Sequence, residues 1–195
     1  MSAHRPVRRF APLAAACALL AAGGAAAPAQ ASPAQASPAP AAQPGPQTPH
    51  CIADRETGEQ RCFATFTAAV EAATGGRIDD APKSPHTAAR NPEFRQSSAA
   101  AEVIQGTFFE HDGYGGASLT IYGAEPCVKD GWVNFQYDLD DWWKDRISSV
   151  QPWANCWLWL YPEPDLGGDR DGPFKENTPD IGTFMNDRTE SIGFS

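Results

Sequence analysis

Acidic side chains concentrate in the C-terminal half of the sequence, where they cluster in segments that have the composition of loops. Residues 103–195 hold 16 Asp and Glu against six Lys and Arg, a balance of −10, while the whole chain of 195 residues has a formal net charge of −9. One interpretation is that these acids keep the protein soluble. The other is that their oxygens bind Ca²⁺, a hard cation that takes carboxylate, carbonyl, hydroxyl and water ligands.

The same charge balance argues against nucleic acid as a partner, because the sequence offers no basic face to meet phosphates. Catalysis is not expected either. His111, Asp112 and Ser118 are the residue types of a hydrolase triad, but positions on one turn cannot form the required chain of hydrogen bonds. A compact domain of about 90 residues also offers no evident long cleft for a pair of glycosidase carboxylates. We therefore expect a protein that is not an enzyme.

The stretch Thr107–Tyr122 carries the strongest local structural signal. At its centre, Gly113, Gly115 and Gly116 can adopt positive φ at no steric cost, as a hairpin corner requires. Apolar and polar residues then alternate over 117–122, which indicates a half-buried strand. The segment is therefore predicted to be a β-hairpin.

The hairpin pattern returns later in the chain. Two sets of residues share one spacing: Phe109, Tyr114 and Gly116, then Tyr161, Leu166 and Gly168. Each set is followed by a polar segment, at 144–149 and 186–191. An internal repeat is a stronger indication of fold than any single motif.

At these positions the chain resembles the βγ-crystallin family. Phe109, Glu110, Tyr114 and Gly116 match the pattern of its Greek-key hairpin: an aromatic residue, an acid, three residues, an aromatic residue, one residue and Gly. The polar segments nearly match its second pattern, two Asn or Asp, two variable residues, Ser or Thr, and Ser. The resemblance covers about residues 103–195. It implies an all-β fold with two Greek-key motifs forming a βγ-crystallin-like sandwich, and it extends to a family of secreted metalloprotease inhibitors with the same fold.

Carried over position by position, the resemblance implies calcium as a ligand. The nominated residues are Asp145 and Ser148 in the first polar segment, and Asn186, Asp187 and Glu190 in the second. In the family, each ion is shared between the loop of one key and the hairpin corner of the other. Lys144 stands where Asn or Asp is usual, Glu190 replaces Ser or Thr, and Pro162 and Leu166 replace the acid and the aromatic of the second hairpin. One working site is therefore expected rather than two, and the alternative is that both loops only preserve the fold.

Short strands bounded by turn residues are expected throughout this domain. We place them at 106–110, 117–122, 132–137, 147–151, 156–161, 172–175, 181–185 and 190–194. Packed as a sandwich, they would bury Leu119, Ile121, Val133, Phe135, Ile147, Leu158, Leu160, Ile181, Phe184, Ile192 and some tryptophans. Of the adjacent Trp142 and Trp143, we expect one in the core and the other shielding it, an exposed sugar or peptide patch being the alternative.

The N-terminal half is expected to form four segments. Residues 1–31 have arginines, an uncharged apolar run and a small-residue cleavage site, which predicts a signal peptide and an extracellular protein without a membrane anchor after cleavage. Residues 32–50, rich in Ala and Pro, predict a disordered linker. Residues 51–82 predict a small module. Residues 83–102, with two prolines, predict a second linker, the alternative being a modest helix across 97–102. The main domain then occupies 103–195.

In the small module, Cys51 and Cys62 predict a disulfide-closed hairpin. A helix is expected after Thr65, with Phe66, Ala69, Val70 and Ala73 on one face. A disulfide between the two remaining mature cysteines, Cys127 and Cys156, would link the two keys.

The loop at 123–131 suggests a second function, inhibition of a secreted protease. Pro126 and a disulfide at Cys127 would stiffen the loop and lower the entropy lost on binding, so that Cys127 and Val128 would be presented to the enzyme. The alternative is an ordinary connection between two strands pinned by its disulfide.

Overall fold

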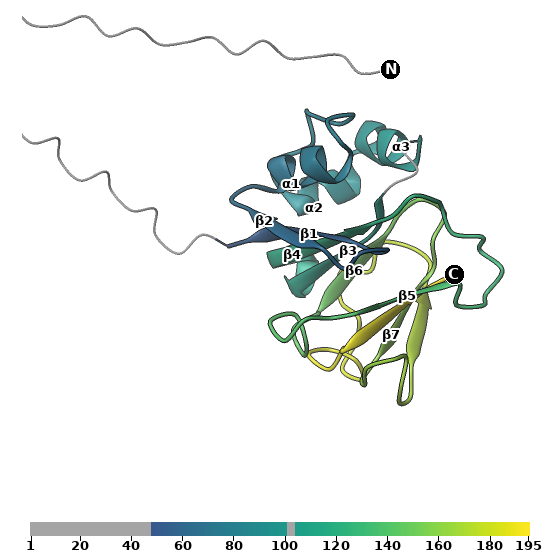
Figure 1. Cartoon of the computed structure of the whole chain (residues 1–195). Helices are drawn as coiled ribbons and strands as arrows, with labels where there is room; N and C mark the ends of the chain where they lie inside the picture. Colours follow the sequence, from purple (N-terminus) through teal and green to yellow (C-terminus); the bar gives the residue numbers. More distant parts are fainter. Residues whose placement is uncertain (1–47, 101–103) are drawn as a thin grey trace, which may run out of the picture. The chain divides into compact units, whose positions relative to one another are not determined.

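A computed structural model describes residues 48–100 and 104–195, so the expected signal peptide and most of the 32–50 linker lie outside the described residues. The elements are β1 (His50–Asp54), β2 (Gln60–Phe63), α1 (Phe66–Ala73), α2 (Pro85–Arg90), α3 (Pro92–Ala100), β3 (Ile104–His111), η1 (Asp112–Tyr114), β4 (Gly115–Tyr122), β5 (Phe135–Asp138), β6 (Ser149–Pro152), β7 (Leu158–Tyr161), β8 (Asp171–Phe174) and β9 (Ser191–Phe194) (Figure 1). None of the helices in these ranges has the length and apolar character that crossing a bilayer requires.

Two sheets form the sandwich. One has the order β2-β1-β4-β3-β6 and the other the order β5-β9-β7-β8. Strand β5 belongs to the first repeat but pairs with β9 of the second, while Thr178 of the second repeat bridges to Val150 on β6 of the first. Each repeat thus contributes its third segment to the other sheet, which is the long return connection of a Greek key. The prediction of two Greek keys in a βγ-crystallin-like sandwich is confirmed.

The core between the sheets matches most of the predicted list. Leu119, Ile121, Ile147, Leu158, Leu160, Ile181 and Ile192 are buried there. Val133 and Phe135 are only half-buried. The predicted strand at 181–185 is wrong, since those residues form a loop and turn, and Phe184 is 47 % exposed. Its apolar residues misled the prediction because Ile181 and Met185 point into the core from a turn rather than from a strand.

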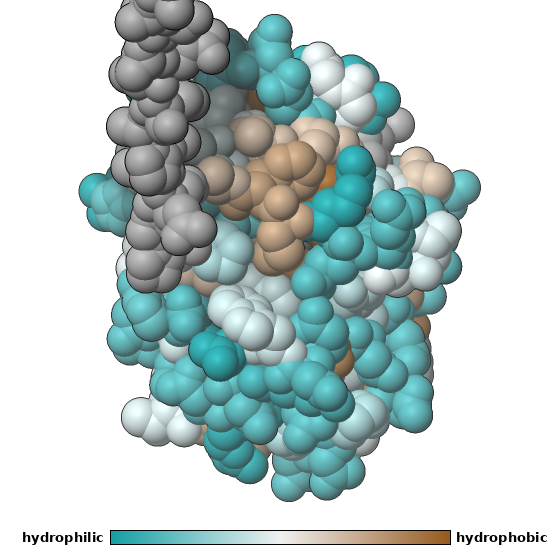
Figure 2. Space-filling view, turned by 60° about the vertical axis from the view of Figure 1, so that its left-hand side comes forward, coloured by the Kyte–Doolittle hydropathy of each residue, from teal (hydrophilic) through white to brown (hydrophobic). Residues whose placement is uncertain are grey.

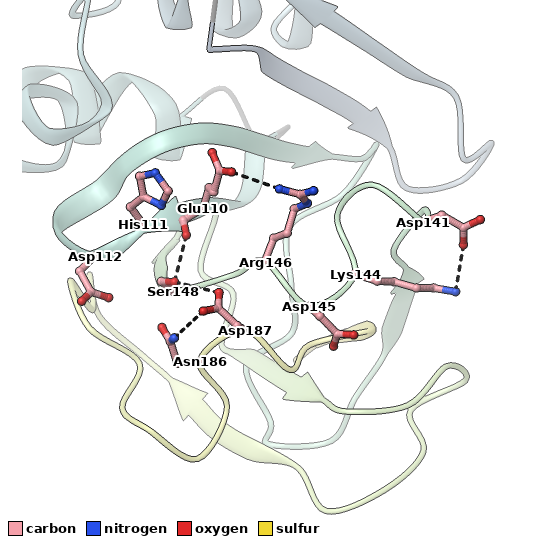
Figure 3. Close-up of a pocket in the computed structure, with 10 residues that line it drawn as sticks. All are labelled: Glu110, His111, Asp112, Asp141, Lys144, Asp145, Arg146, Ser148, Asn186 and Asp187. Carbon is pink, nitrogen blue, oxygen red and sulfur yellow. Dashed lines mark hydrogen bonds and ion pairs between the residues drawn. The ribbon is translucent and has the colours of Figure 1, made fainter.

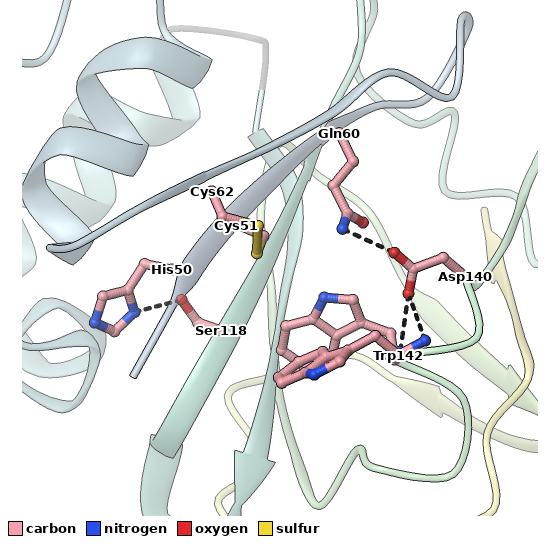
Figure 4. The surroundings of a disulfide bond; sticks show 8 residues. His50, Cys51, Gln60, Cys62, Ser118, Asp140 and Trp142 are labelled. Atoms are coloured by element: carbon pink, nitrogen blue, oxygen red, sulfur yellow. Dashed lines mark hydrogen bonds between the residues drawn. A yellow bond between two sulfur atoms is a disulfide. The ribbon is translucent and has the colours of Figure 1, made fainter. Parts of the chain in front are cut away.

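The disulfide-closed hairpin continues the first sheet. Cys51 and Cys62 are bonded across β1 and β2, and β1 also pairs in parallel with β4. The His50 ring Nδ1 lies 2.8 Å from the buried Ser118 Oγ on β4, a hydrogen bond that holds the start of β1 (Figure 4). The edge of β4 is therefore covered by chain that precedes the Greek keys.

The helices pack on the outer side of this sheet. Helix α1 begins after Thr65, whose Oγ1 accepts from the Ala68 N–H (3.2 Å), and its predicted apolar face is buried as expected. Together with Phe94 of α3, this face packs against Ile52 and Trp153 in a second core. On one face of the molecule an apolar area remains visible among hydrophilic side chains (Figure 2).

Residues 83–102, expected to be a linker, instead contain α2 and α3. Each helix has Pro at its first position and a polar cap before it: Ser84 Oγ accepts from the Thr87 N–H (3.2 Å), and Asn91 Oδ1 accepts from the Phe94 N–H (2.9 Å). Proline is favoured at the first helical position, because its missing N–H is not needed there. The Ser-Pro and Asn-Pro pairs were therefore helix-start signals.

Candidate metal site

The corner of the first hairpin is closed by a buried serine. Ser149 Oγ donates to the His111 carbonyl (2.7 Å) and accepts from the Tyr114 N–H (3.1 Å). Gly113 and Gly116 have positive φ as predicted, but the third such residue is Tyr114 (φ 64°) rather than Gly115. A Cβ at Gly116 would lie 2.9 Å from Glu110 Oε2, so glycine is required there by close approach as well as by φ.

The second hairpin repeats this corner. Ser191 Oγ donates to the Glu163 carbonyl (2.6 Å) and accepts from the Leu166 N–H (3.1 Å). Leu166 and Gly168 have positive φ, like Tyr114 and Gly116 of the first corner. The internal repeat predicted from the sequence is thus present in the structure as the same pair of serine hydrogen bonds at the two hairpin corners.

The two polar loops cross over and hold each other. The Asp145 N–H donates to the Thr189 carbonyl (3.0 Å), and the Asp187 N–H donates to the Ile147 carbonyl (3.1 Å). Both aspartates have positive φ, 57° and 54°, a conformation in which Asp is tolerated better than most residues. The aspartate of each polar loop therefore lies next to the polar loop of the other repeat.

Three oxygens from separate segments meet at Ser148. Its Oγ lies 3.0 Å from the Glu110 carbonyl oxygen and 3.4 Å from Asp187 Oδ1. The second oxygen of Asp187 accepts from Asn186 Nδ2 (2.9 Å), which fixes the carboxylate. These residues line an open hollow of about 610 Å³, with Asp145 on its wall (Figure 3). The arrangement brings one hydroxyl, one main-chain carbonyl and one carboxylate within reach of a single cation.

At the equivalent place in the other half, a lysine meets an acid. Glu190 occupies the position of Ser148, and Lys144 occupies the position of Asn186. The Lys144 Nζ is 3.9 Å from Glu190 Oε2 and 3.4 Å from Asp141 Oδ1. An ammonium therefore already stands beside the carboxylate that would have to bind a metal ion.

Three features of the two repeats characterise the fold. The polar loops bond to each other, a serine closes each hairpin corner, and each repeat contributes its third segment to the other sheet. The fold is βγ-crystallin-like. Among solved structures, the chain is similar to a βγ-crystallin domain from Clostridium beijerinckii (22 % identity, TM-score 0.36, covering 46 % of this chain and 95 % of that one). It is also similar to a βγ-crystallin domain from Flavobacterium johnsoniae (21 % identity, TM-score 0.36, covering 46 % of this chain and 92 % of that one). A third similar structure is the N-terminal domain of protein S (18 % identity, TM-score 0.35, covering 47 % of this chain and 94 % of that one).

No family model and no curated protein matches the chain. The expected similarity to metalloprotease inhibitors is not shown by these matches.

Of the five residues nominated as calcium ligands, the structure brings Ser148, Asn186 and Asp187 together. Asp145 lines the same hollow, while Glu190 is outside its lining and beside Lys144. Within residues 48–100 and 104–195, no three His, Cys, Asp or Glu side chains converge as a metal cluster. The Glu110 carbonyl was missed as a candidate because a main-chain oxygen has no residue signature of its own.

The lining of the hollow includes two cations, Lys144 and Arg146, among five acidic side chains. Arg146 Nη1 lies 3.3 Å from Glu110 Oε1, and Glu110 Oε2 accepts from the Ala117 N–H (3.1 Å). The Glu110 side chain is therefore engaged in holding the hairpin, which leaves its carbonyl as the oxygen that faces Ser148.

The tryptophan pair lies just before the first polar loop. Trp143 is fully buried, and Trp142, 40 % exposed, packs against it with ring centroids 4.8 Å apart. Asp140 Oδ1 accepts from both backbone N–H groups, and its other oxygen accepts from Gln60 Nε2 on β2 (2.8 Å) (Figure 4). The expectation of one core and one shielding tryptophan is confirmed, and the disulfide hairpin is tied to the chain leading into the first loop.

His50 and Ser118 form a Ser–His hydrogen bond, the first element of a hydrolase site. Ser118 is fully buried, so a substrate cannot reach its hydroxyl. Burial lowers the pKa of His50 below its usual 6.5, because the charged imidazolium is poorly solvated there. The pair therefore holds β1 on β4 rather than forming a nucleophile.

The loop at 123–131 has one large exposed hydrophobic residue. Cys127 is buried and bonded to Cys156, as predicted, while its neighbour Val128 is 66 % exposed. The loop thus presents a side chain to solvent directly beside a covalent anchor.

Proposed function

We propose that this is an exported, non-enzymatic βγ-crystallin-like protein that binds one calcium ion in the hollow at Ser148 and is stabilised by it. The observation that carries the proposal is the convergence of Ser148 Oγ, the Glu110 carbonyl and Asp187 Oδ1 at 3.0 and 3.4 Å. Oxygens bound to one Ca²⁺ at about 2.3–2.6 Å lie about 3 Å apart from each other. Water would supply the remaining ligands in so open a hollow.

Charge and covalent structure support the proposal. Residues 103–195 carry a balance of −10, which raises the local concentration of cations. The two disulfides, Cys51–Cys62 and Cys127–Cys156, fit the oxidising compartment that an exported protein enters. Because the two loops and the first hairpin supply the oxygens, an ion bound there would cross-link segments of both keys.

The experiment is thermal unfolding of the mature chain in excess calcium and in chelator. A ligand present at 100 times its dissociation constant adds about 2.7 kcal/mol, or a rise in Tm of about 5–10 °C for a chain of this size. Ser148→Ala and Asp187→Gly should remove the rise. Glycine suits the positive φ of Asp187, and Asp165→Gly makes the same change at φ 55° in the second hairpin as a matched control. An unchanged Tm for the wild-type chain at millimolar calcium contradicts the proposal.

Protease inhibition is a second candidate, favoured by Val128, which is 66 % exposed beside the buried, disulfide-bonded Cys127. A loop anchored by a disulfide loses less entropy on binding than a free one. Secreted metalloproteases and serine proteases would be titrated with the wild-type chain and with Val128→Asp. Inhibition that Val128→Asp abolishes supports this function, and a loop that the proteases cleave or ignore excludes it.

A further inference from the structure

The outer face of the second sheet carries an aromatic row. Leu158 and Leu160 of the strand β7 point into the core between the sheets. Since side chains alternate along a strand, Trp157, Trp159 and Tyr161 lie on the opposite face. Helices α1 and α3 pack against the other sheet, through Ile52 and Trp153, and so do not cover this one.

Cations are interleaved with these rings. Lys175 Nζ lies 3.9 Å and Lys129 Nζ 5.8 Å from the ring centroid of Trp157. The guanidinium carbon of Arg170 lies 4.0 Å from the centroid of Trp159, and its Nη1 donates to the Tyr161 hydroxyl (3.3 Å). Lys129, Arg170 and Lys175 are half of the six Lys and Arg in residues 103–195. Half of the cations of this acidic domain therefore lie at the aromatic face.

A further tryptophan stands exposed at the edge of this face. Trp132 is 78 % exposed, and it borders a hollow of about 440 Å³ that is otherwise lined by Gly131, Val133, Tyr161 and Arg170. Asp130 Oδ1 accepts from the Trp132 N–H (2.9 Å), which fixes the turn that presents the indole. Arginine supplies the only charged side chain in the lining of this hollow.

We propose that this surface binds an anionic polysaccharide, with a sugar ring stacked on Trp132 and a carboxylate or sulfate of the sugar paired with Arg170. An exposed indole offers a flat apolar face with a polar edge, which suits a sugar ring. Arg170 is held in place by Trp159 and Tyr161, so little side-chain freedom is lost when its remaining N–H groups meet an anion.

The overall negative charge of the chain does not prevent this binding. At physiological ionic strength the Debye length is about 8 Å, so exposed acids farther away than that are largely screened. Asp130, Asp169, Asp171 and Glu176 are adjacent in sequence to the three cations of the aromatic face and lie within that distance, so the attraction comes from the direct ion pair between Arg170 and the anion. Binding should consequently weaken as salt is added.

The test is affinity gel electrophoresis of the mature chain through polygalacturonate, dextran sulfate or neutral dextran, with chelator present so that calcium plays no part. Retardation by at least one polyanion, and not by dextran, is expected. Carboxylate and sulfate polymers separate the two kinds of anion. Trp132→Ala should weaken retardation about tenfold, the effect of losing one ring contact, and Arg170→Gln should abolish the preference for polyanions over dextran.

Phe184→Ala is the matched control, because Phe184 is another exposed ring (47 %) with an arginine, Arg188, 5.4 Å from its centroid. It should migrate like the wild-type chain. Circular dichroism verifies that Arg170→Gln, which uncovers Trp159, is folded. Equal retardation in dextran, unchanged binding of Trp132→Ala, or no retardation by either polyanion at low salt would overturn the proposal.

Discussion

The two Greek keys share the hydrogen bonds that shape them but differ in the groups that could bind an ion. Ser149 and Ser191 close the two hairpin corners with the same pair of bonds. The first polar loop offers the hydroxyl of Ser148 beside the Glu110 carbonyl. The equivalent position of the second loop holds Glu190, whose Oε2 lies 3.9 Å from the Lys144 Nζ. The contacts that form the fold and the groups proposed to bind an ion therefore reside in different side chains, even where those are adjacent in sequence.

The lysine explains why the second position is the weaker candidate. An ammonium near a carboxylate supplies positive charge where a cation would otherwise sit, and a divalent ion would have to displace it or bind beside it. In the first position, the corresponding residue is Asn186, which orients the Asp187 carboxylate without adding charge. The difference predicts one calcium ion per chain rather than two.

The largest expected effect on stability comes from removing the serine hydroxyl that closes the hairpin corner in each key. Ser149→Ala and Ser191→Ala should each lower the free energy of unfolding by about 1–3 kcal/mol, because each removes a buried hydroxyl that bonds one backbone N–H and one carbonyl. Urea denaturation measures both. If one substitution were neutral, the two corners would not be equivalent.

A smaller effect should follow from making the second position resemble the first. In Lys144→Asn with Glu190→Ser, the ammonium is gone and a hydroxyl is restored, so a weak second ion should bind. An ion at ten times its dissociation constant adds about 1.4 kcal/mol of stability. Calcium titration of Tm compares the double variant with the wild-type chain; an unchanged calcium response would show that Lys144 and Glu190 are not what separates the keys.

The smallest expected effect is a pH dependence of stability at β1, the strand that extends the first sheet and that His50 holds on β4. The pKa of His50 is lowered in the folded protein, so the unfolded chain binds a proton first as the pH falls. Stability is therefore fully present above pH 6.5 and declines as the pH falls through the folded pKa. Denaturant titrations between pH 7.5 and 5 should show this decline in the wild-type chain and a smaller one in His50→Gln. Equal declines would place the pH dependence elsewhere.

Local signals in the sequence predicted much of this fold. The alternation after Gly116, the repeated spacing and the cap at Thr65 each correspond to an element, because neighbouring residues determine them. Both disulfides were also anticipated, since four cysteines remain after the leader and the export signal favours pairing.

Long-range partners were not predictable in the same way. Nothing local in His50–Asp54 shows that this strand pairs in parallel with β4, and nothing around Thr178 shows that it bridges to the other key. The candidate site was half predicted. Ser148 and Asp187 follow from a sequence pattern, whereas the Glu110 carbonyl became visible only when three segments were brought together.

The most direct test is a calorimetric calcium titration of the wild-type chain and of two matched variants, Asp187→Gly and Asp145→Gly. Both aspartates have nearly the same positive φ and equivalent loop bonds, so glycine disturbs the two loops alike. We predict one ion per chain in the wild type, binding lost in Asp187→Gly, and binding retained within a few-fold in Asp145→Gly. Two equal sites, or loss of binding in Asp145→Gly alone, would contradict the assignment of the ion to Ser148 and Asp187.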